Sequence, residues 1–254
     1  MIKGSKKVLQ LILVPAVILL IWGLLCRMGV FSAFVLPGPD RVWKTFISMT
    51  ASGELFRNVL ISVERVLIGF AISFVLAFVL GVLSCLNPNA KNYYRPTLEF
   101  MRHIPPMSLI PLLILWFGIG ETPKIIVIVL TAFFPIFMNT EAGLLGCNPK
   151  LLEVGDVLHM GKWATFFQIR LPAAVPDILV GMQIGLGYSF RAIVGAEMIA
   201  AAAGLGYMIQ DAQAMARADK MLVGIIMIGI LGILTDVIFK FVMHRLLKER
   251  FHFK

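Results

Sequence analysis

Residues 66–86 read VLIGFAISFVLAFVLGVLSCL, and these 21 positions carry no charged side chain. An α-helix rises 1.5 Å per residue, so about 20 mostly apolar residues cross a hydrocarbon layer roughly 30 Å thick. Apolar core helices of soluble proteins usually have shorter uninterrupted runs. This stretch therefore predicts a helix that spans a lipid bilayer.

The composition extends this prediction to the whole chain. Of the 254 residues, 59% are Ala, Val, Ile, Leu, Met, Phe, Trp, Tyr or Cys, and only 15% are charged. Soluble domains have about 45–50% apolar and about 25% charged residues. The values exclude a water-soluble globule, a disordered chain, a collagen, a coiled coil and a small disulfide-stabilised fold. We expect an all-α polytopic membrane protein with one transmembrane domain over residues 1–254.

Other apolar runs bring the predicted number of transmembrane helices to six. The third and fourth runs contain prolines, which membrane bundles tolerate because neighbouring groups pair with the freed carbonyls. The first run could be a secretory signal peptide, but it exceeds the usual signal core and no small-residue cleavage site follows, so we expect a retained helix. The approximate spans are residues 8–26, 66–86, 104–120, 123–140, 177–203 and 221–243.

The loops on the two sides of these spans differ in charge. Loops on the side of the termini hold 14 Lys and Arg, against 7 on the other side. Because cytoplasmic loops carry an excess of positive charge, we expect both termini on the cytoplasmic side of the membrane. The formal net charge of +9 is then a property of these loops, and we expect no nucleic-acid partner.

Residues 38–58 form an amphipathic segment on the other side of the membrane. Trp43, Phe46 and Ile47 follow helical spacing, with basic residues between them. This pattern is typical of a short helix that lies along the outer membrane surface. An ordinary polar connection is the alternative reading of the same segment.

Residues 141–172 form a long loop on the predicted cytoplasmic side. Asn148 followed by Pro149 is a typical helix start, because the Asn side chain caps the first turn and proline needs no partner there. The sequence predicts a short amphipathic helix and then a second helical stretch that Pro172 and Pro176 end. The apolar side chains need a groove, which either the loop itself or a soluble partner could supply.

This loop resembles the cytoplasmic signature E-A-A-x3-G-x9-I-x-L-P of inner-membrane permease subunits of binding-protein-dependent ABC importers. Glu153 aligns with its first position and Pro172 with its last, at matching spacing, while Val154 and Gly155 replace the alanines and His159 replaces the glycine. The resemblance implies a coupling helix that docks in a cleft of a cytoplasmic ATPase. The residues expected to take part are Leu152, Glu153, Val154, Gly155, Asp156, His159, Ile169, Leu171 and Pro172.

Four further segments look like the sulfonate/nitrate/taurine branch of these permeases: residues 104–121, 132–140, 196–198 and 204–213. The resemblance implies a type I ABC importer permease fold, a second permease copy in a homodimer, two ATPases and an extracytoplasmic substrate-binding protein. It implies that ATP and Mg bind to the ATPase, so we expect no cofactor in this chain. The implied cargo is a small anion such as an aliphatic sulfonate, taurine or nitrate, with bicarbonate or a vitamin precursor as alternatives.

Two charged residues lie inside the fifth predicted span. Charge within a membrane is costly, so Arg191 and Glu197 are candidates for the translocation pathway. They point about 120° apart on a helix, so each needs a partner elsewhere, and Asp236 is one candidate. Arg191 in a central cavity would attract an oxyanion, and an interhelical ion pair is the structural alternative. Glu64 and Arg65, next to the second span, are expected to snorkel to the outer interface.

Trp116, Phe117 and Phe133 are candidates for a hydrophobic gate, although aromatic residues in membrane helices mostly serve packing. Residues 155–163 have the wrong spacing for a phosphate-binding loop and lack the Ser or Thr that would hold Mg. The four His and three Cys show no metal-ligand spacing. We therefore expect no catalytic or metal site and interpret the chain as not itself an enzyme. A secondary carrier that works without an ATPase is the alternative from another class.

Overall fold

The computed structural model describes residues 2–248, with side chains for residues 13–243 apart from Pro88, and for Arg245. Residues 1 and 249–254 of the predicted domain lie outside the described residues. Regular structure in the described part is entirely helical, as predicted. The elements are α1 (Ile2–Arg27), α2 (Pro39–Ala51), α3 (Glu54–Leu86), α4 (Pro88–Arg102), η1 (Pro106–Leu109), α5 (Ile110–Phe117), α6 (Glu121–Leu145), α7 (Pro149–Val157), α8 (Lys162–Thr165), η2 (Phe166–Arg170), α9 (Leu171–Ala200), α10 (Leu205–Ala214) and α11 (Ala218–Lys248).

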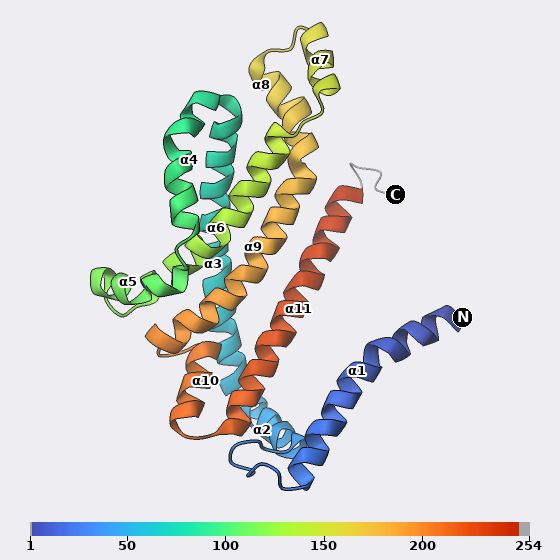
Figure 1. Cartoon of the computed structure of the whole chain (residues 1–254), viewed down its shortest axis with the longest axis vertical. Helices are drawn as coiled ribbons and strands as arrows, with labels where there is room; N and C mark the ends of the chain where they lie inside the picture. The colour runs from blue at the N-terminus through green and yellow to red at the C-terminus, as the bar shows by residue number, and fades with distance from the viewer. Residues whose placement is uncertain (1, 249–254) are drawn as a thin grey trace.

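Helices α3, α6 and α9 form the centre of the bundle (Figure 1). Glycines let α9 approach α6 closely: a Cβ added at Gly181 would lie 2.7 Å from the Cβ of Asn139, and one at Gly185 would lie 2.8 Å from Cγ1 of Ile136. Small residues allow this approach in membrane bundles, where van der Waals packing drives helix association. The two glycines therefore fix which face of α9 meets α6.

The remaining long helices pack around this centre to different degrees. α11 runs beside α10, and α2 lies across its first turns, where Thr45 Oγ1 donates to Asp219 Oδ2 at 2.7 Å. α1 diverges from the bundle and packs mainly on α2 (Figure 1). Trp22 Nε1 donates to the Pro37 carbonyl at 3.1 Å and so fixes the turn between α1 and α2.

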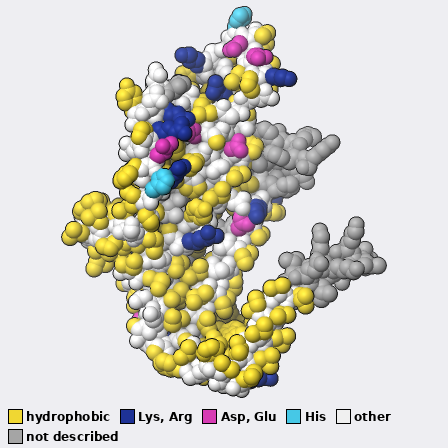
Figure 2. All heavy atoms as spheres, viewed as in Figure 1, with side chains coloured by type: hydrophobic (Ala, Val, Ile, Leu, Met, Phe, Trp, Pro, Cys, Tyr) yellow, Lys and Arg dark blue, Asp and Glu magenta, His cyan; other side chains and the backbone are white. Residues whose placement is uncertain are grey.

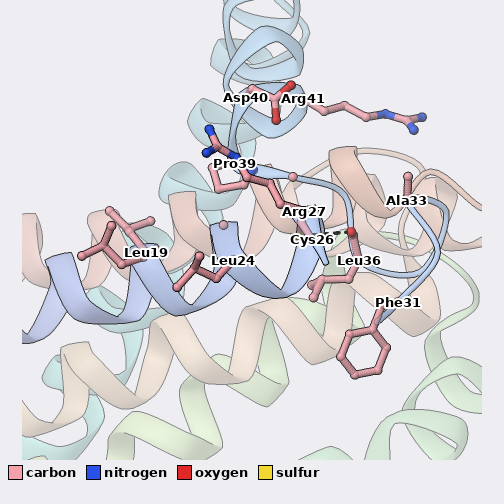
Figure 3. Close-up of a pocket in the computed structure, with 13 residues that line it drawn as sticks. Leu19, Leu24, Cys26, Arg27, Phe31, Ala33, Leu36, Pro39, Asp40 and Arg41 are labelled. Atoms are coloured by element: carbon pink, nitrogen blue, oxygen red, sulfur yellow. Dashed lines mark hydrogen bonds between the residues drawn. The ribbon is translucent and has the colours of Figure 1, made fainter. Parts of the chain in front are cut away.

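A pocket lies at the junction of α1 and α2 (Figure 3). Leu19, Leu24 and Phe31 are among its apolar lining residues, and Cys26 Sγ donates to the Leu36 carbonyl at 3.5 Å beside it. None of the site residues predicted from the sequence lines this pocket. The candidate functional residues are therefore found in other parts of the bundle.

Within the described part of the chain, four helices are long and apolar enough to cross a membrane: Glu54–Leu86, Glu121–Leu145, Lys162–Ala200 and Ala218–Met243. Asn89–Arg102 and Pro106–Phe117 add a fifth span if the two, bent by 86°, are counted together. The apolar part of α1 among the described residues, Leu13–Arg27, is shorter. The structure confirms a helical membrane fold, whereas the described residues do not reproduce the predicted count of six spans.

The third predicted span, residues 104–120, is not a continuous helix. Pro105 has an extended backbone (ψ 121°), and only the short elements η1 and α5 follow it. Proline cannot donate to the preceding turn and disfavours helical geometry in the residue before it, so two prolines in succession break the run. As a result α5 projects sideways from the bundle (Figure 1).

The segment predicted as an amphipathic helix over residues 38–58 divides in two. α2 ends at Ala51, and α3 begins at Glu54 after Gly53, whose φ of +76° favours glycine. Within α2 Trp43 is exposed while Met49 is buried, so the helix is amphipathic. α3 thus starts well before residue 66 and includes the charged residues that the predicted second span left out.

The prediction that Pro172 and Pro176 end the second cytoplasmic helix is wrong. Both prolines lie within α9, which continues α8 and η2 as one long helix, Lys162–Ala200. η2 is a π-helical segment directly before Pro172. A π-helical turn changes the hydrogen-bond register, which allows the helix to continue where proline provides no N–H donor.

Candidate functional site

The predicted amphipathic helix of the long loop is present as α7. It starts at Pro149, and the side-chain oxygen of Asn148 accepts a hydrogen bond from the Lys150 backbone N–H at 3.0 Å. An Asn cap satisfies one of the free N–H groups of the first turn. The local sequence signals at 148–149 therefore do set the start of this helix.

The two ends of the sequence signature meet in space. Gly155 in α7 is buried, and a Cβ added there would lie 3.0 Å from Cδ1 of Ile169 in η2. Leu171 and Pro172, at the end of the signature, lie in the first turn of α9, separated from Ile169 by one residue. The spacing thus places α7 against the base of the long helix that enters the bundle.

His159 follows α7 with φ 50°, in the left-handed region. The turn is closed by Met160 N–H, which donates to the Gly155 carbonyl at 2.9 Å. Left-handed residues that end helices are usually glycine, because a side chain there costs about 1–2 kcal/mol. The turn that a family glycine would make is therefore formed here by a strained histidine.

Large apolar side chains of α7 and α8 are exposed at the end of the molecule that lies at the top of Figure 1. Val157 is 77% exposed, and Trp163 stacks on the equally exposed Phe167 at 6.1 Å. Contiguous exposed apolar residues mark interaction sites. We call this surface the α7 face; its members are Leu151, Val154, Val157, Leu158, Trp163 and Phe167, with Glu153 and Asp156 exposed beside them.

Glu197 is fully buried and pairs with a residue of another helix. One carboxylate oxygen lies 2.8 Å from Arg65 Nη1, and Ser62 Oγ donates to the same carboxylate at 2.8 Å. Asp236, the candidate partner in the last span, accepts a hydrogen bond from Gln183 and pairs with Lys240 at 2.7 Å. The partner on another helix that Glu197 requires is Arg65 of α3.

Arg65 does not snorkel to an interface as predicted. Its side chain is only 8% exposed, and its Nε and Nη2 meet the two oxygens of Glu121 at 2.5 and 2.7 Å. Lys124, 3% exposed, also reaches Glu121, at 2.8 Å. We call Arg65, Glu121, Lys124 and Glu197 the buried ion network; it joins α3, α6 and α9.

The network also holds the connection between α9 and α10. Arg65 Nη1 donates to the Ala203 carbonyl at 2.6 Å, Asn58 Oδ1 accepts from Gly204 N–H at 2.8 Å, and Ser62 Oγ accepts from Leu205 N–H at 2.9 Å. Gly204 has φ +117°, and a side chain there would collide with the Glu197 carboxylate. The short loop is thus fixed to α3 by hydrogen bonds between α3 side chains and its own backbone.

Most of this network does not follow from the sequence patterns. In the sequence Arg65 only bounds an apolar run, and Glu121 only ends a segment that resembles related permeases. One signal was available: Glu121 and Lys124 are three residues apart, a spacing that pairs charges on a helix. Tertiary packing brings the charges of α6 and α9 to Arg65, and this packing is not visible in the local sequence.

The structure does not bring the predicted pathway residues together. Arg191 is exposed and lies 5.6 Å from the centre of the Tyr188 ring, a cation–π contact. Trp116 and Phe117 are exposed on the projecting α5, which Figure 2 shows as a largely hydrophobic lobe. Phe133 stacks on Phe137 at 5.6 Å inside α6. Glu197 is thus the one predicted pathway residue that belongs to the buried ion network.

Residues 73–248 match the family of binding-protein-dependent transport system inner membrane components. The chain belongs to this family. The match covers α7, the base of α9 and three of the four residues of the buried ion network. The α7 face and the buried ion network are therefore features of a transport-system membrane component.

Several curated relatives of this transport component span nearly its whole length. It is 39% identical over 94% of its residues to the putative aliphatic sulfonates transport permease protein SsuC of Bacillus subtilis (strain 168), covering 87% of that protein. It is 30% identical over 92% to the taurine transport system permease protein TauC of Escherichia coli (strain K12), covering 86%. It is 32% identical over 91% to the nitrate import permease protein NrtB of a Synechocystis strain, covering 86%.

The fold of the transport component is also that of a solved structure. A chain of the inward-facing MetNI methionine ABC transporter superposes with a TM-score of 0.66, at 20% identity, covering 77% of this chain and 95% of the other. At this identity the likeness establishes the fold alone. The transport component therefore has the architecture of an ABC importer permease, in agreement with the type I permease fold expected from the sequence.

Proposed function

We propose that this chain forms the translocation pathway of an ATP-driven importer for a small organic anion of the aliphatic sulfonate class. The observation that carries the proposal is the α7 face, an apolar surface at the tip of a membrane bundle whose signature residues resemble an ATPase-coupling segment. Relatives named for sulfonate, taurine and nitrate transport support the cargo class. These three cargoes share one chemical feature, an oxyanion group.

The α7 face docks in a cleft of a separate cytoplasmic ATPase, which binds ATP and Mg. Gly155 seats α7 against Ile169, and the helix that begins with α8 runs without interruption to Ala200. A displacement of α7 by the ATPase is therefore carried along one rigid element as far as Glu197. Because ATP-bound and ATP-free ATPase differ in their contacts with α7, they shift the pathway between two conformations.

Both termini and α7 lie on the cytoplasmic side, and the turns at α2 and α10 face the binding protein on the opposite side. The two-to-one bias of Lys and Arg toward the α7 side supports this orientation. In Figure 2 charged side chains gather toward the α7 end, while hydrophobic ones cover the lower part of the same face. Two copies of the chain, arranged as a homodimer, enclose the pathway and carry two ATPases.

Cargo selection rests largely with the binding protein, and this chain supplies the path. Arg191, with Trp116 and Phe117 on α5, faces out of a single copy, and in the homodimer these side chains line the pathway. Phe133 packs within α6 and contributes to the wall rather than to a gate. The chain itself carries out no covalent step, since hydrolysis belongs to the ATPase.

Uptake of radiolabelled ethanesulfonate by cells that carry the chain, its ATPase and its binding protein tests this function. We expect uptake that requires ATP and is lost when the ATPase is inactivated. Uptake that persists without the ATPase, driven by an ion gradient alone, would identify a secondary carrier. ATP-dependent uptake of nitrate in place of ethanesulfonate would keep the importer and change the cargo.

A further inference from the structure

We propose that Arg65 and Lys124 form an exchange site for a single oxyanion, which Glu121 occupies at rest and the transported anion takes over during passage. The proposal rests on the anionic cargo class proposed above and assigns it a site in the buried ion network. It requires that one carboxylate of the network is fixed and the other replaceable, and the structure distinguishes the two clearly.

The four charges of the network differ in exposure. The side chains of Arg65 and Lys124 are 8% and 3% exposed, and that of Glu197 is 0% exposed. The Glu121 side chain is 57% exposed, although both of its partners are buried. Two buried cations thus share one counter-ion that lies at the surface of the chain.

Glu197 is the fixed member of the pair of carboxylates. It accepts hydrogen bonds from Ser62 Oγ at 2.8 Å, from the Gly206 N–H at 2.9 Å and from Arg65. These bonds hold it to two other helices, α3 and α10. If Glu121 leaves, Glu197 balances one of the two cations, and one buried positive charge remains without a counter-ion. Such a charge is strongly unfavourable, so the site then requires a monovalent anion.

The donors of this site also fit a three-oxygen anion. Arg65 Nε and Nη2 each meet one oxygen of Glu121, and Lys124 Nζ shares Oε1 with Nη2. Three donors therefore converge on two oxygens. A sulfonate or nitrate presents three oxygens with one negative charge, so it can accept one bond from each donor, and guanidinium forks bind such oxyanions in a bidentate manner.

Glu121 has room to leave the site. It is the first residue of α6, after the turn 118–120, so its displacement does not require the helix to unwind. Gly118 has φ +75°, and a Cβ at Gly118 or Gly120 would meet no atom within 4 Å. Ile119 between them is 82% exposed. The backbone directly before Glu121 is therefore surrounded by open space.

Binding of sodium ethanesulfonate to the permease–ATPase complex in lipid nanodiscs, measured by isothermal titration calorimetry, tests the site. Glu121→Gln removes the competing charge, so we expect it to bind ethanesulfonate at least about tenfold more tightly than the unaltered complex. Adding Lys124→Met should abolish this gain. Ethyl methyl sulfone, which resembles the probe but carries no charge, should not bind more tightly to any variant.

Glu54→Gln is the matched control, because Glu54 is also half-exposed and pairs with a lysine, Lys220, at 3.0 Å outside the network. It should leave the affinity for ethanesulfonate unchanged. Equal affinities of the unaltered complex, E121Q and E54Q would overturn the proposal and leave the network a structural ion pair. If E121Q does not assemble, the unaltered complex is compared with Lys124→Met alone. Weak, millimolar binding of ethanesulfonate that Lys124→Met eliminates supports the site. Binding that Lys124→Met leaves intact contradicts it.

The uptake assay tests the proposed function and the binding assay tests the anion site, so the two can fail independently. Cells that fail to take up ethanesulfonate would reject the sulfonate cargo, whereas tighter binding by E121Q would still establish an anion site in the network. Normal uptake with no difference between the variants would keep the function and reject the site.

Discussion

Gly155 in α7 lies directly against Ile169 in η2, with only 3.0 Å between the position of an added Cβ and the Ile169 Cδ1 atom. These residues are far enough apart in sequence that only folding brings them together, and both belong to the motif that resembles a coupling signature. The contact joins the surface proposed to meet the ATPase to the helix proposed to carry its motion.

A larger side chain at residue 155 should uncouple α7 from η2. Gly155→Ala requires the flexible end of Ile169 to move by a few tenths of an ångström, so we expect modest loss, whereas Gly155→Leu should displace α7 and abolish ATP-dependent uptake. Ile169→Val should restore the activity of Gly155→Ala by removing the nearest methyl group. ATP hydrolysis and uptake measured together in proteoliposomes check this, and full uptake by Gly155→Leu would contradict the contact's role.

His159→Gly should stabilise the turn after α7. The histidine has φ 50°, a conformation that glycine adopts without strain, so we expect a gain of about 1 kcal/mol in local stability. Hydrogen exchange of the α7 amides should slow several-fold. Exchange that stays unchanged or accelerates would show that the histidine side chain makes a compensating contact.

Gly204→Ala should destabilise the bundle by about 3 kcal/mol or more, since it both forbids a φ of +117° and drives a methyl group into the Glu197 carboxylate. Gly229→Ala in α11 is the control, because a Cβ there meets nothing within 4 Å. Thermal unfolding in detergent distinguishes the two. Equal melting temperatures would show that the α9–α10 loop is not fixed as described.

Glu197→Gln should destabilise the protein more than Glu121→Gln. Glu197 is fully buried against Arg65, and removing one partner of a buried pair typically costs about 3–5 kcal/mol. Glu121 is more than half exposed, so solvent screens its loss and we expect a smaller change. The midpoints of thermal unfolding of both variants give the comparison, and a larger loss for Glu121→Gln would reverse the assignment of the fixed carboxylate.

The features predicted correctly depend on local sequence. The start of α7 follows from Asn148 and Pro149, and the helical membrane fold follows from long uncharged runs such as residues 66–86. A span defined by lack of charge necessarily stopped at Arg65, although α3 continues through it. Defining transmembrane spans as runs of uncharged residues therefore misses any ion pair that forms inside a membrane bundle.

Proline was the other source of error. Pro172 and Pro176 were read as helix ends, but the π-helical segment η2 lets the helix continue, while Pro105 and Pro106 do break their run. η2 is held by tertiary packing: Phe166 lies in one buried cluster with Leu144 and Ile178, and Ile169 lies against Gly155 of α7. Sequence alone does not contain this tertiary context.

The central claim, that the α7 face is the docking surface for a separate ATPase, is tested most directly by the affinity between the detergent-solubilised permease and its purified ATPase. Val157→Ser and Leu158→Ser together remove two side chains that are 77% and 65% exposed and should weaken binding at least tenfold without changing the melting temperature. Tyr93→Ser, which removes an 85% exposed aromatic residue from α4, should leave the affinity unaltered. Unchanged affinity of the double α7 variant would contradict the account.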